Sequence, residues 1–331
     1  MSEVVVITGA SAGVGRATAR AFGRRGASVA LIARGRAGLE ACAAEVREAG
    51  GEALVLPCDV SSFDAVDAAA SAVEEAFGPI DVWVNVAMAA VLAEVAETSA
   101  EEFRRVTEVT YLGSVHGIQA ALKRMLPRDR GKIVQVGSAL AYRGIPLQAS
   151  YCGAKHAIKG FCEALRCELL HRKSGVSLTL VHLPGLNTTQ FGWVRARTQG
   201  EPRPVAPVYQ PEIAARAIVW ASHHRRRELW VGFSTVYTII GNRVAPWLGD
   251  LYLARSGFQG QQTDQPLDPA RPDYLFSPLD DATDRGSHGE FGDEAKTRSP
   301  QVFAAEHRWA LTAGAAAGLV AGAVAAVTAR R

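Results

Sequence analysis

The feature that most constrains the fold is the direct succession of an apolar run, a glycine-rich turn and a helical pattern near the N-terminus. The apolar run covers residues 4–7, and the turn at residues 8–15 reads TGASAGVG. A second apolar run at 28–33 completes a strand, turn, helix and strand of about thirty residues, the length expected of a dinucleotide-binding βαβ unit. Because a crossover helix returns the chain to the edge from which it started, the two strands are expected to be parallel.

The same alternation continues along most of the chain. It predicts further helices at 36–49, 63–77, 101–126, 150–173 and 211–222, and further strands at 53–57, 81–86, 132–137, 176–183 and 228–232. The strands are apolar throughout rather than at alternate positions, which is typical of a parallel sheet buried on both faces. We therefore predict an α/β fold, namely a doubly wound parallel sheet of the Rossmann type.

The glycines of the turn have separate expected roles. Gly9 and Gly13 allow a tight turn and a close approach of the backbone to a pyrophosphate, whereas Gly15 lets the helix pack on the sheet. The free N–H groups at the helix N-terminus favour the negative charge of phosphates. The spacing TGxxxGxG differs from the GxGxxG fingerprint, so the turn alone is weak evidence for a dinucleotide site.

A second pattern lies near the middle of the chain. Tyr151 and Lys155 stand four residues apart in a predicted helix, so both side chains lie on one face. A neighbouring ammonium favours the phenolate, so we expect the pKa of Tyr151 to be lowered toward the working pH, where it can exchange a proton with a substrate oxygen. Ser138 directly follows the strand at 132–137, and its hydroxyl is expected to hold the same oxygen. Such a pair alone is common on solvated helix surfaces, and its meaning depends on the rest of the chain.

Taken together, these motifs resemble those of the short-chain dehydrogenase/reductase family over about residues 3–235. The matching residues are Thr8 to Gly15, Asp59, Val60, Asn85, Ala87, Ser138, Tyr151, Lys155, Pro184, Gly185 and Thr188. The resemblance implies an oxidoreductase in which Tyr151 is the acid or base that works with Ser138 and Lys155. It also implies a homodimer or homotetramer formed through the helices at 101–126 and 150–173.

The resemblance further implies where a dinucleotide is held. Asp59 and Val60 are expected to meet the adenine, and Lys155 to hold the nicotinamide ribose. The expected cofactor-binding residues are Gly9, Ser11, Gly13, Val14, Gly15, Arg34, Asp59, Val60, Asn85, Ala87, Tyr151, Lys155, Pro184, Gly185, Leu186 and Thr188, with 184–188 flanking the nicotinamide.

Two positions depart from the family pattern. The family's NNAG reads Asn85-Val86-Ala87-Met88, and the family's catalytic Asn aligns with Thr110. Thr110 is expected to hydrogen-bond a water with a shorter reach, and we include it among the catalytic residues. Val86, Met88 and Thr110 favour the alternative of a nucleotide-binding scaffold without turnover. The intact set of Ser138, Tyr151 and Lys155 favours an enzyme.

The end of the second strand indicates which dinucleotide is used. An acid at this place binds the ribose 2′-OH of NAD, whereas an arginine accommodates the 2′-phosphate of NADP. The sequence reads Ala33-Arg34, and Ser11 in the glycine turn can add a hydrogen bond. We therefore predict NADP(H), with an ordinary exposed arginine as the alternative for Arg34.

The substrate is expected to be an apolar ketone, aldehyde or alcohol. The residues expected to face it are mostly apolar: Leu140, Tyr142, Leu147, Leu186, Phe191 and Trp193. The long irregular segment 186–210 is typical of a loop that covers a substrate. Arg143 weakens this prediction, because it lies close in sequence to these residues and an arginine can bind the carboxylate of a charged substrate.

Composition narrows the class of protein further. A net charge of +3 is too small to indicate nucleic-acid binding, and no cluster of His, Cys, Asp and Glu has metal-ligand spacing. Five cysteines without a CxxC pair indicate reduced thiols. With no signal-peptide pattern at the N-terminus, we predict a cytoplasmic setting.

We divide the chain into a catalytic domain at 1–258, an acidic, Pro/Gly-rich linker at 259–305 and an apolar helix at 306–331. Residues 234–257 look helical, with a break near Pro246, and packing on the domain, a dimer contact and a membrane-facing surface stay open as their roles. The stretch 309–329 holds 21 residues without a charge, and as a helix it would extend about 31 Å, close to the thickness of a bilayer core. We predict membrane association through this C-terminal helix, with docking on the domain or on a partner as the alternative, since alanine and glycine dominate it.

Overall fold

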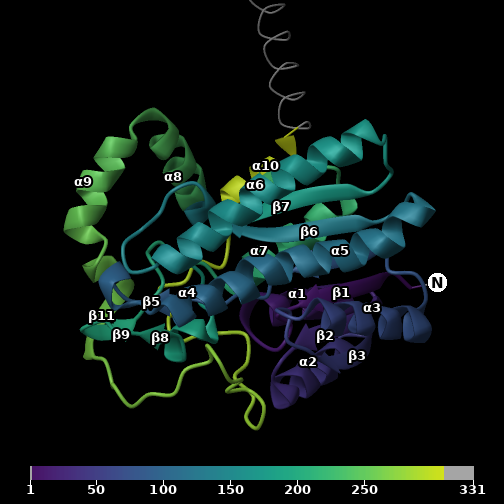
Figure 1. The fold of residues 1–331 in the computed structure, drawn as a ribbon, viewed down its shortest axis with the longest axis horizontal. Helices are drawn as coiled ribbons and strands as arrows, with labels where there is room; N and C mark the ends of the chain where they lie inside the picture. The colour runs from purple at the N-terminus through teal and green to yellow at the C-terminus, as the bar shows by residue number, and fades with distance from the viewer. Residues whose placement is uncertain (1, 309–331) are drawn as a thin grey trace, which may run out of the picture.

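The computed structural model describes residues 2–308, and its centre is a seven-stranded parallel sheet. The strands are β1 (Val4–Thr8), β2 (Ser28–Ala33), β3 (Glu52–Pro57), β4 (Val82–Asn85), β6 (Lys132–Ser138), β7 (Ser177–Leu183) and β10 (Glu228–Trp230). Their order in the sheet is β10-β7-β6-β4-β1-β2-β3, with every pair parallel. The doubly wound fold predicted from the sequence is therefore confirmed (Figure 1).

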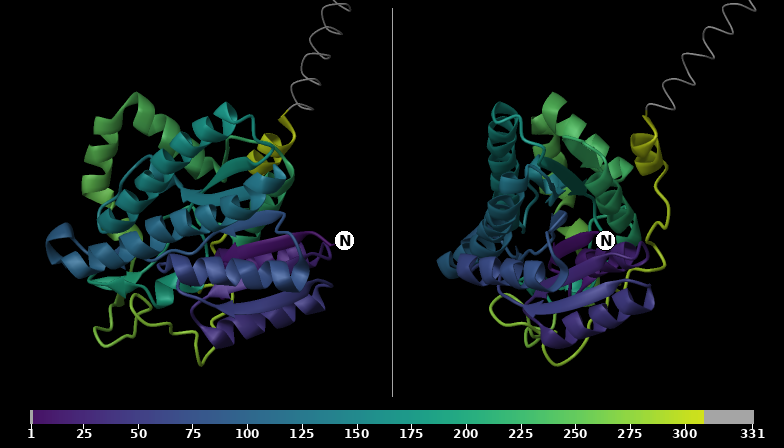
Figure 2. Two further views of the ribbon diagram at one scale, coloured as in Figure 1. Left: turned by 45° about the vertical axis from the view of Figure 1, so that its right-hand side comes forward. Right: turned by 90° about the vertical axis from the view of Figure 1, so that its right-hand side faces the viewer.

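Helices cover both faces of this sheet. The helices α1 (Gly13–Gly23), α2 (Arg36–Glu48) and α7 (Pro211–His223) pack on one face, and α3 (Phe63–Phe77), α5 (Gly113–Met125) and α6 (Ala149–His171) pack on the other (Figure 2). Each face has its own apolar core, because the strands carry buried aliphatic side chains on both sides. Burial of both faces explains why the strands show no alternation of apolar and polar residues.

The long helix predicted at 101–126 is divided in the structure. An α-helix, α4 (Ala100–Val106), leads into one π-helical stretch (Thr107–Leu112) and then into α5. Ser99 and Glu102 form a capping box that fixes the start of α4. A π-helical turn inserts an extra residue into the ladder and often occurs at functional sites. Here it places Thr110 against the backbone of Ala89.

Several short elements lie outside the central sheet. The strands β5 (Val91–Leu92) and β8 (Arg195–Ala196) pair with each other, and β9 (Gly200–Pro202) pairs with β11 (Gln262–Pro266). The short 3₁₀ helices are at Val95–Glu97, Leu126–Arg128, Ala139–Ala141, Thr189–Gly192 and Gln259–Gln261. As predicted for 234–257, two helices follow, α8 (Phe233–Val244) and α9 (Pro246–Ser256), and they project from the body as a hairpin (Figure 1). Pro246 starts the second helix because proline is compatible with the first helical turn.

Residues 259–305 do not stand apart from the domain. Ion pairs join this segment to the body of the protein, including Arg195 with Asp273 at 2.8 Å and Arg203 with Glu294 at 2.6 Å. The segment is irregular, as its composition predicts, and in Figure 1 it runs beneath β8 and β9 toward the left side of α2. The structure thus differs from the expectation of a linker, because charged pairs and strand β11 tie the segment down.

The last described element is α10 (Pro300–Glu306), whose Val302 is buried against the body of the protein. The C-terminal membrane helix was predicted at 306–331, and all but its first three residues lie outside the described residues. Within residues 2–308, no helix combines the length and apolar character needed to cross a bilayer.

Candidate active site

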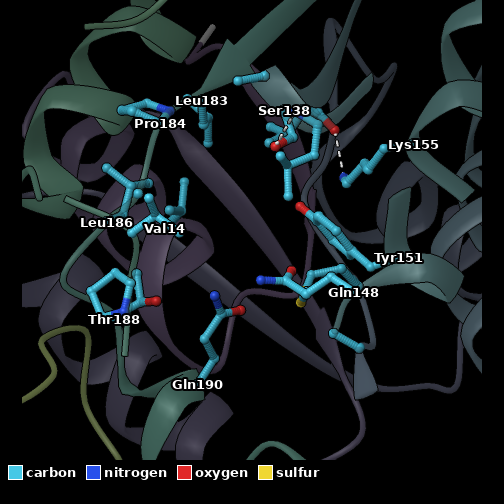
Figure 3. Close-up of a pocket in the computed structure, with 18 of the residues that line it drawn as sticks. Val14, Ser138, Gln148, Tyr151, Lys155, Leu183, Pro184, Leu186, Thr188 and Gln190 are labelled. Atoms are coloured by element: carbon cyan, nitrogen blue, oxygen red, sulfur yellow. Dashed lines mark hydrogen bonds between the residues drawn. The ribbon is translucent and has the colours of Figure 1, made fainter. Parts of the chain in front are cut away.

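One cavity of about 730 Å³ opens along the carboxyl ends of the parallel strands. The predicted site residues that line it are Gly9, Ser11, Gly13, Val14, Gly15, Arg34, Asp59, Val60, Ala87, Ser138, Tyr151, Lys155, Pro184, Gly185, Leu186 and Thr188. Asn85 and Thr110 do not line it. Figure 3 shows the side chains of Ser138 and Tyr151 directed into the cavity from one side, and Leu186 and Thr188 across from them. This is the edge at which ligands bind in open α/β sheets.

The glycine turn has the geometry that a dinucleotide pyrophosphate requires. Gly9 and Gly13 have positive φ angles of 71° and 52°. A Cβ atom at Gly9 would lie 2.8 Å from the backbone of Ala87, and a Cβ atom at Gly15 would overlap the carbonyl oxygen of Gly9. Gly9 and Gly15 therefore accept no side chain without a backbone shift, and the absence of side chains lets a ligand approach the backbone of the turn closely.

The predicted catalytic residues come from two elements. Ser138 ends β6, and its hydroxyl accepts a hydrogen bond from the N–H of Leu140 at 3.1 Å. Tyr151 and Lys155 lie on α6, with the Lys155 Nζ atom 5.5 Å from the centre of the Tyr151 ring. Lys155 is buried, and its Nζ donates to the carbonyl of Val136 at 2.9 Å (Figure 3). A lysine Nζ has three N–H donors, so the protein leaves donors available for a ligand.

Burial dominates the protonation of this pair. It raises the pKa of Tyr151 above its ordinary value, although the neighbouring Ser138 hydroxyl acts in the opposite direction. Burial also lowers the pKa of Lys155 to about 8. The expectation that Lys155 lowers the pKa of Tyr151 is thus wrong for the protein by itself, since desolvation disfavours the charged forms of both groups.

A buried histidine contacts the backbone of Ser138, and no sequence pattern indicated it. His182 is fully buried on β7, and its Nδ1 lies 3.1 Å from the carbonyl oxygen of Ser138. Its Nε2 lies 3.9 Å from Glu228, whose carboxylate accepts hydrogen bonds from Tyr142 and Trp230. Burial lowers the pKa of His182 to about 4, so the ring is neutral and fixes the end of β6.

Asn85 and Thr110 use their side chains within the protein. Asn85 donates to the Ser114 carbonyl and to Gln135, both at 3.1 Å. The Thr110 hydroxyl accepts from the N–H of Ala89 and donates to the carbonyl of Ala89, both at 2.9 Å. With its single donor already used, Thr110 holds the turn after β4 instead of presenting its hydroxyl to the cavity. These contacts correct the expectation of a catalytic Thr110 to a positioning role.

The end of the cavity at which an adenosine is expected contains charged side chains. Arg34 lines it, but its guanidinium donates to the backbone carbonyls of Tyr274, Leu275 and Phe276. Burial raises the pKa of Asp59, but hydrogen bonds from Ser61 and Arg105 outweigh it and hold that pKa below its ordinary value. An ionised Asp59 is thus fixed at this end, where a polar base edge can meet it.

The opposite end of the cavity is mostly apolar. Leu140, Leu186, Phe191 and Trp193 line it as predicted, whereas Tyr142 and Leu147 do not. Tyr142 turns instead to Glu228, because its hydroxyl donates to that carboxylate. Arg143 lines the cavity but is paired with Asp250 and donates to Asn242.

Several lining residues carry no sequence signal. Gln148 and Gln190 point toward the cavity in Figure 3, and Tyr274 and Asp280 reach it from the segment expected to be a linker. No periodicity or motif marks these positions, so only the folded chain identifies them. Within residues 2–308, no group of three or more His, Cys, Asp or Glu side chains is placed to hold a metal ion.

Comparisons with known proteins agree with this geometry. The family model described as short chain dehydrogenase matches residues 3–199. An uncharacterized oxidoreductase, YxnA of Bacillus subtilis, is 31% identical over 98% of this chain and 90% of its own length. A putative ketoacyl reductase of Streptomyces coelicolor is 37% identical over 57% of this chain and 72% of its own length.

A solved structure is similar as well. It is an alcohol dehydrogenase from the archaeon Thermococcus sibiricus, complexed with 5-hydroxy-NADP, with a TM-score of 0.61 and 29% sequence identity. The likeness covers 70% of this chain and 96% of that one. The YxnA match therefore extends over nearly the whole chain, whereas the solved dehydrogenase leaves almost a third of this chain without a counterpart.

Proposed function

The chain belongs to the short-chain dehydrogenase family of oxidoreductases, and from that premise we propose that it interconverts a carbonyl and an alcohol on an apolar substrate with NADP(H). The observation that carries this proposal is the shared cavity. Ser138, Tyr151 and Lys155 face the same space as the glycine turn. A dinucleotide on the turn and a carbonyl beside Tyr151 are thus brought to one place.

The residues fit a nicotinamide dinucleotide. The glycine turn would accept close contact with a pyrophosphate, Asp59 and Val60 would meet the adenine, and the lining residues Pro184, Gly185, Leu186 and Thr188 would flank the nicotinamide. A bound dinucleotide supplies or accepts the hydride at the carbonyl carbon. The protein has to hold the substrate oxygen, move a proton to it and exclude water.

Ser138 and Tyr151 handle the oxygen. In the direction of reduction, the Ser138 hydroxyl donates a hydrogen bond to the carbonyl oxygen and Tyr151 transfers its proton to it, which gives the alcohol. The tyrosinate that remains is favoured by the Lys155 ammonium, and it regains a proton from solvent. Because Lys155 has a pKa of about 8, it is mostly charged at neutral pH.

The choice of NADP(H) is supported by Arg34 and Ser11 at the adenosine end. Both residues line the cavity, and an arginine after β2 suits a 2′-phosphate. The solved alcohol dehydrogenase carries an NADP analogue, which agrees with this choice.

The proposal of an apolar substrate is supported by the far end of the cavity. The hairpin of α8 and α9 adds Leu248 and Leu253 to the apolar lining. Arg143, the one residue that weakened this prediction, has its charge offset by Asp250. A cavity so lined holds a hydrocarbon chain or ring better than a small charged acid.

A screen of purified protein for NADPH oxidation tests the proposal. Carbonyl compounds of graded size are offered, from small 2-oxo acids to long-chain aldehydes and bulky ketones. Turnover that rises with apolar size supports the proposal, and efficient reduction of only the charged acids contradicts the substrate class. Binding of NADPH without turnover of any compound would favour the alternative of a nucleotide-binding scaffold.

A further inference from the structure

Residues 274–286, which we call the strap, lie across the adenosine end of the cavity. Its first three residues accept the hydrogen bonds of Arg34 through their carbonyl oxygens. Further along, Asp280 is buried and lines the cavity itself. The strap belongs to the yellow-green segment that runs beneath β8 and β9 in Figure 1.

The strap also covers the N-terminus of α2. The N–H groups of Arg36 and Ala37 donate to the side chain and the carbonyl of Asp281, at 3.0 and 3.1 Å. The N–H of Gly38 donates to the carbonyl of Asp280 at 3.0 Å. Gly35, the residue before the helix, supplies no side-chain cap. The strap thus provides the hydrogen-bond acceptors that an anion would otherwise offer to this helix start.

The Asp280 carboxylate fits here because two glycines leave room for it. A Cβ atom at Gly35 would overlap Asp280 Oδ1. A Cβ atom at Gly38 would lie 2.9 Å from Asp280 Oδ2 and 2.9 Å from the Cβ of Ser11. The carboxylate therefore lies near Ser11, and its charge also acts on Arg34; these are the two residues that support the choice of NADP(H).

A second contact ties the strap to the phosphate turn. The N–H of Gly13 donates to the carbonyl of Gly286 at 3.3 Å. Arg16, which is 3% exposed, is held between Asp284 of the strap and Glu45. The Gly13 N–H, a group expected to meet a phosphate, thus already has a partner within the chain.

From these contacts we propose that Asp280 is a specificity-determining residue, and that the strap is an internal occupant of the 2′-phosphate subsite which NADP(H) displaces and NAD(H) does not. The inference rests on the proposed function, since it takes a nicotinamide dinucleotide as the ligand. A 2′-phosphate would be repelled by the Asp280 carboxylate and attracted by Arg34. When it binds, the Arg34 guanidinium leaves the strap carbonyls for the phosphate, and the strap is released. A ribose 2′-OH carries no charge and leaves the strap in place.

The strap lies beyond residues 3–199, the part of the chain that the family model matches. The match with YxnA covers 98% of this chain, whereas the likeness to the solved alcohol dehydrogenase covers 70% of it.

Two measurements on the full-length protein test the proposal. The first compares NADPH and NADH binding in wild type and Asp280→Asn, followed by fluorescence of the reduced nicotinamide. We expect Asp280→Asn to tighten NADPH binding about tenfold, because one like charge is removed, and to change NADH binding less than twofold. Glu290→Gln is the matched control, since it removes an exposed negative charge from the same segment and should change neither affinity.

Weaker NADPH binding in Asp280→Asn, or an equal change for both dinucleotides, would overturn the proposal. The second measurement follows hydrogen exchange of the strap in wild type and needs no variant. NADPH is expected to speed exchange in 274–286 while NADH slows it or leaves it unchanged, and equal protection by both would contradict the strap's displacement. Failure of the proposed function has a separate signature, in which neither dinucleotide binds wild type.

Discussion

The two ends of the cavity are built in different ways. The catalytic end is formed by neighbouring elements of the sheet, with Ser138 at the end of β6 and Tyr151 and Lys155 on the following helix. The end proposed to hold the adenosine is bordered by residues more than two hundred positions away from β2, with Arg34 held by the carbonyls of Tyr274 to Phe276. The residues proposed for the chemistry are thus placed by elements close in sequence, whereas the other end of the cavity is shaped by a distant segment.

If this comparison is right, changes at the catalytic end alter turnover, and changes at the adenosine end alter which dinucleotide binds. The largest expected effect is that of Lys155→Met. It removes the buried ammonium that favours the tyrosinate, so we expect turnover to fall about 10²–10³-fold. Lys159→Met is the control, one turn further along α6, where the lysine pairs with Glu163. Steady-state kinetics with NADPH should show loss in the first variant only, and equal losses in both would break the comparison.

The next effect is at the adenosine end. Arg34→Ala removes the guanidinium that meets a 2′-phosphate, and we expect NADPH to bind about tenfold more weakly while NADH binding is unchanged or slightly tighter. Arg36→Ala tests a nearby exposed arginine and should change NADPH affinity less than threefold. Titration of both reduced dinucleotides gives the values. An unchanged preference for NADPH in Arg34→Ala would mean that this arginine serves only to hold the strap.

A smaller effect concerns stability and pH. Burial lowers the pKa of Lys155 to about 8, so between this value and the ordinary pKa near 10.5 the unfolded chain binds more protons than the folded one. The free energy of unfolding is thus expected to gain from Lys155 as pH rises through this window, by at most about 3 kcal/mol. Urea unfolding of wild type and Lys155→Met at pH 7.5 and pH 10 isolates the contribution of Lys155. The variant should have the larger free energy of unfolding at pH 7.5, and the difference from wild type should be smaller at pH 10.

The parts of the fold and of the site that the sequence predicts are those set by local patterns. The parallel sheet, its helices and the set of Ser138, Tyr151 and Lys155 follow from periodicity and from the fixed spacing of residues within one element. The tight turn at Gly9 and Gly13 could be predicted because glycine is the residue that tolerates positive φ angles.

What the sequence could not show are contacts between distant segments. The carboxylate of Asp280 reaches α2 by folding of a polar, aperiodic segment, which no local pattern marks. The hydroxyl of Thr110 was expected to meet a water, but a π-helical turn aims it at Ala89. Burial likewise determines the pKa of Tyr151, and burial depends on tertiary structure rather than on the distance between two residues in a helix.

The central claim is that Tyr151 transfers a proton beside a dinucleotide held by the rest of the cavity. The most direct test measures NADPH affinity and turnover together in Tyr151→Phe, which keeps the ring and removes only the hydroxyl. We expect turnover on a reducible apolar carbonyl to fall at least about a hundredfold, with the NADPH dissociation constant changed less than threefold. Turnover equal to that of wild type, with NADPH still bound, would contradict the claim.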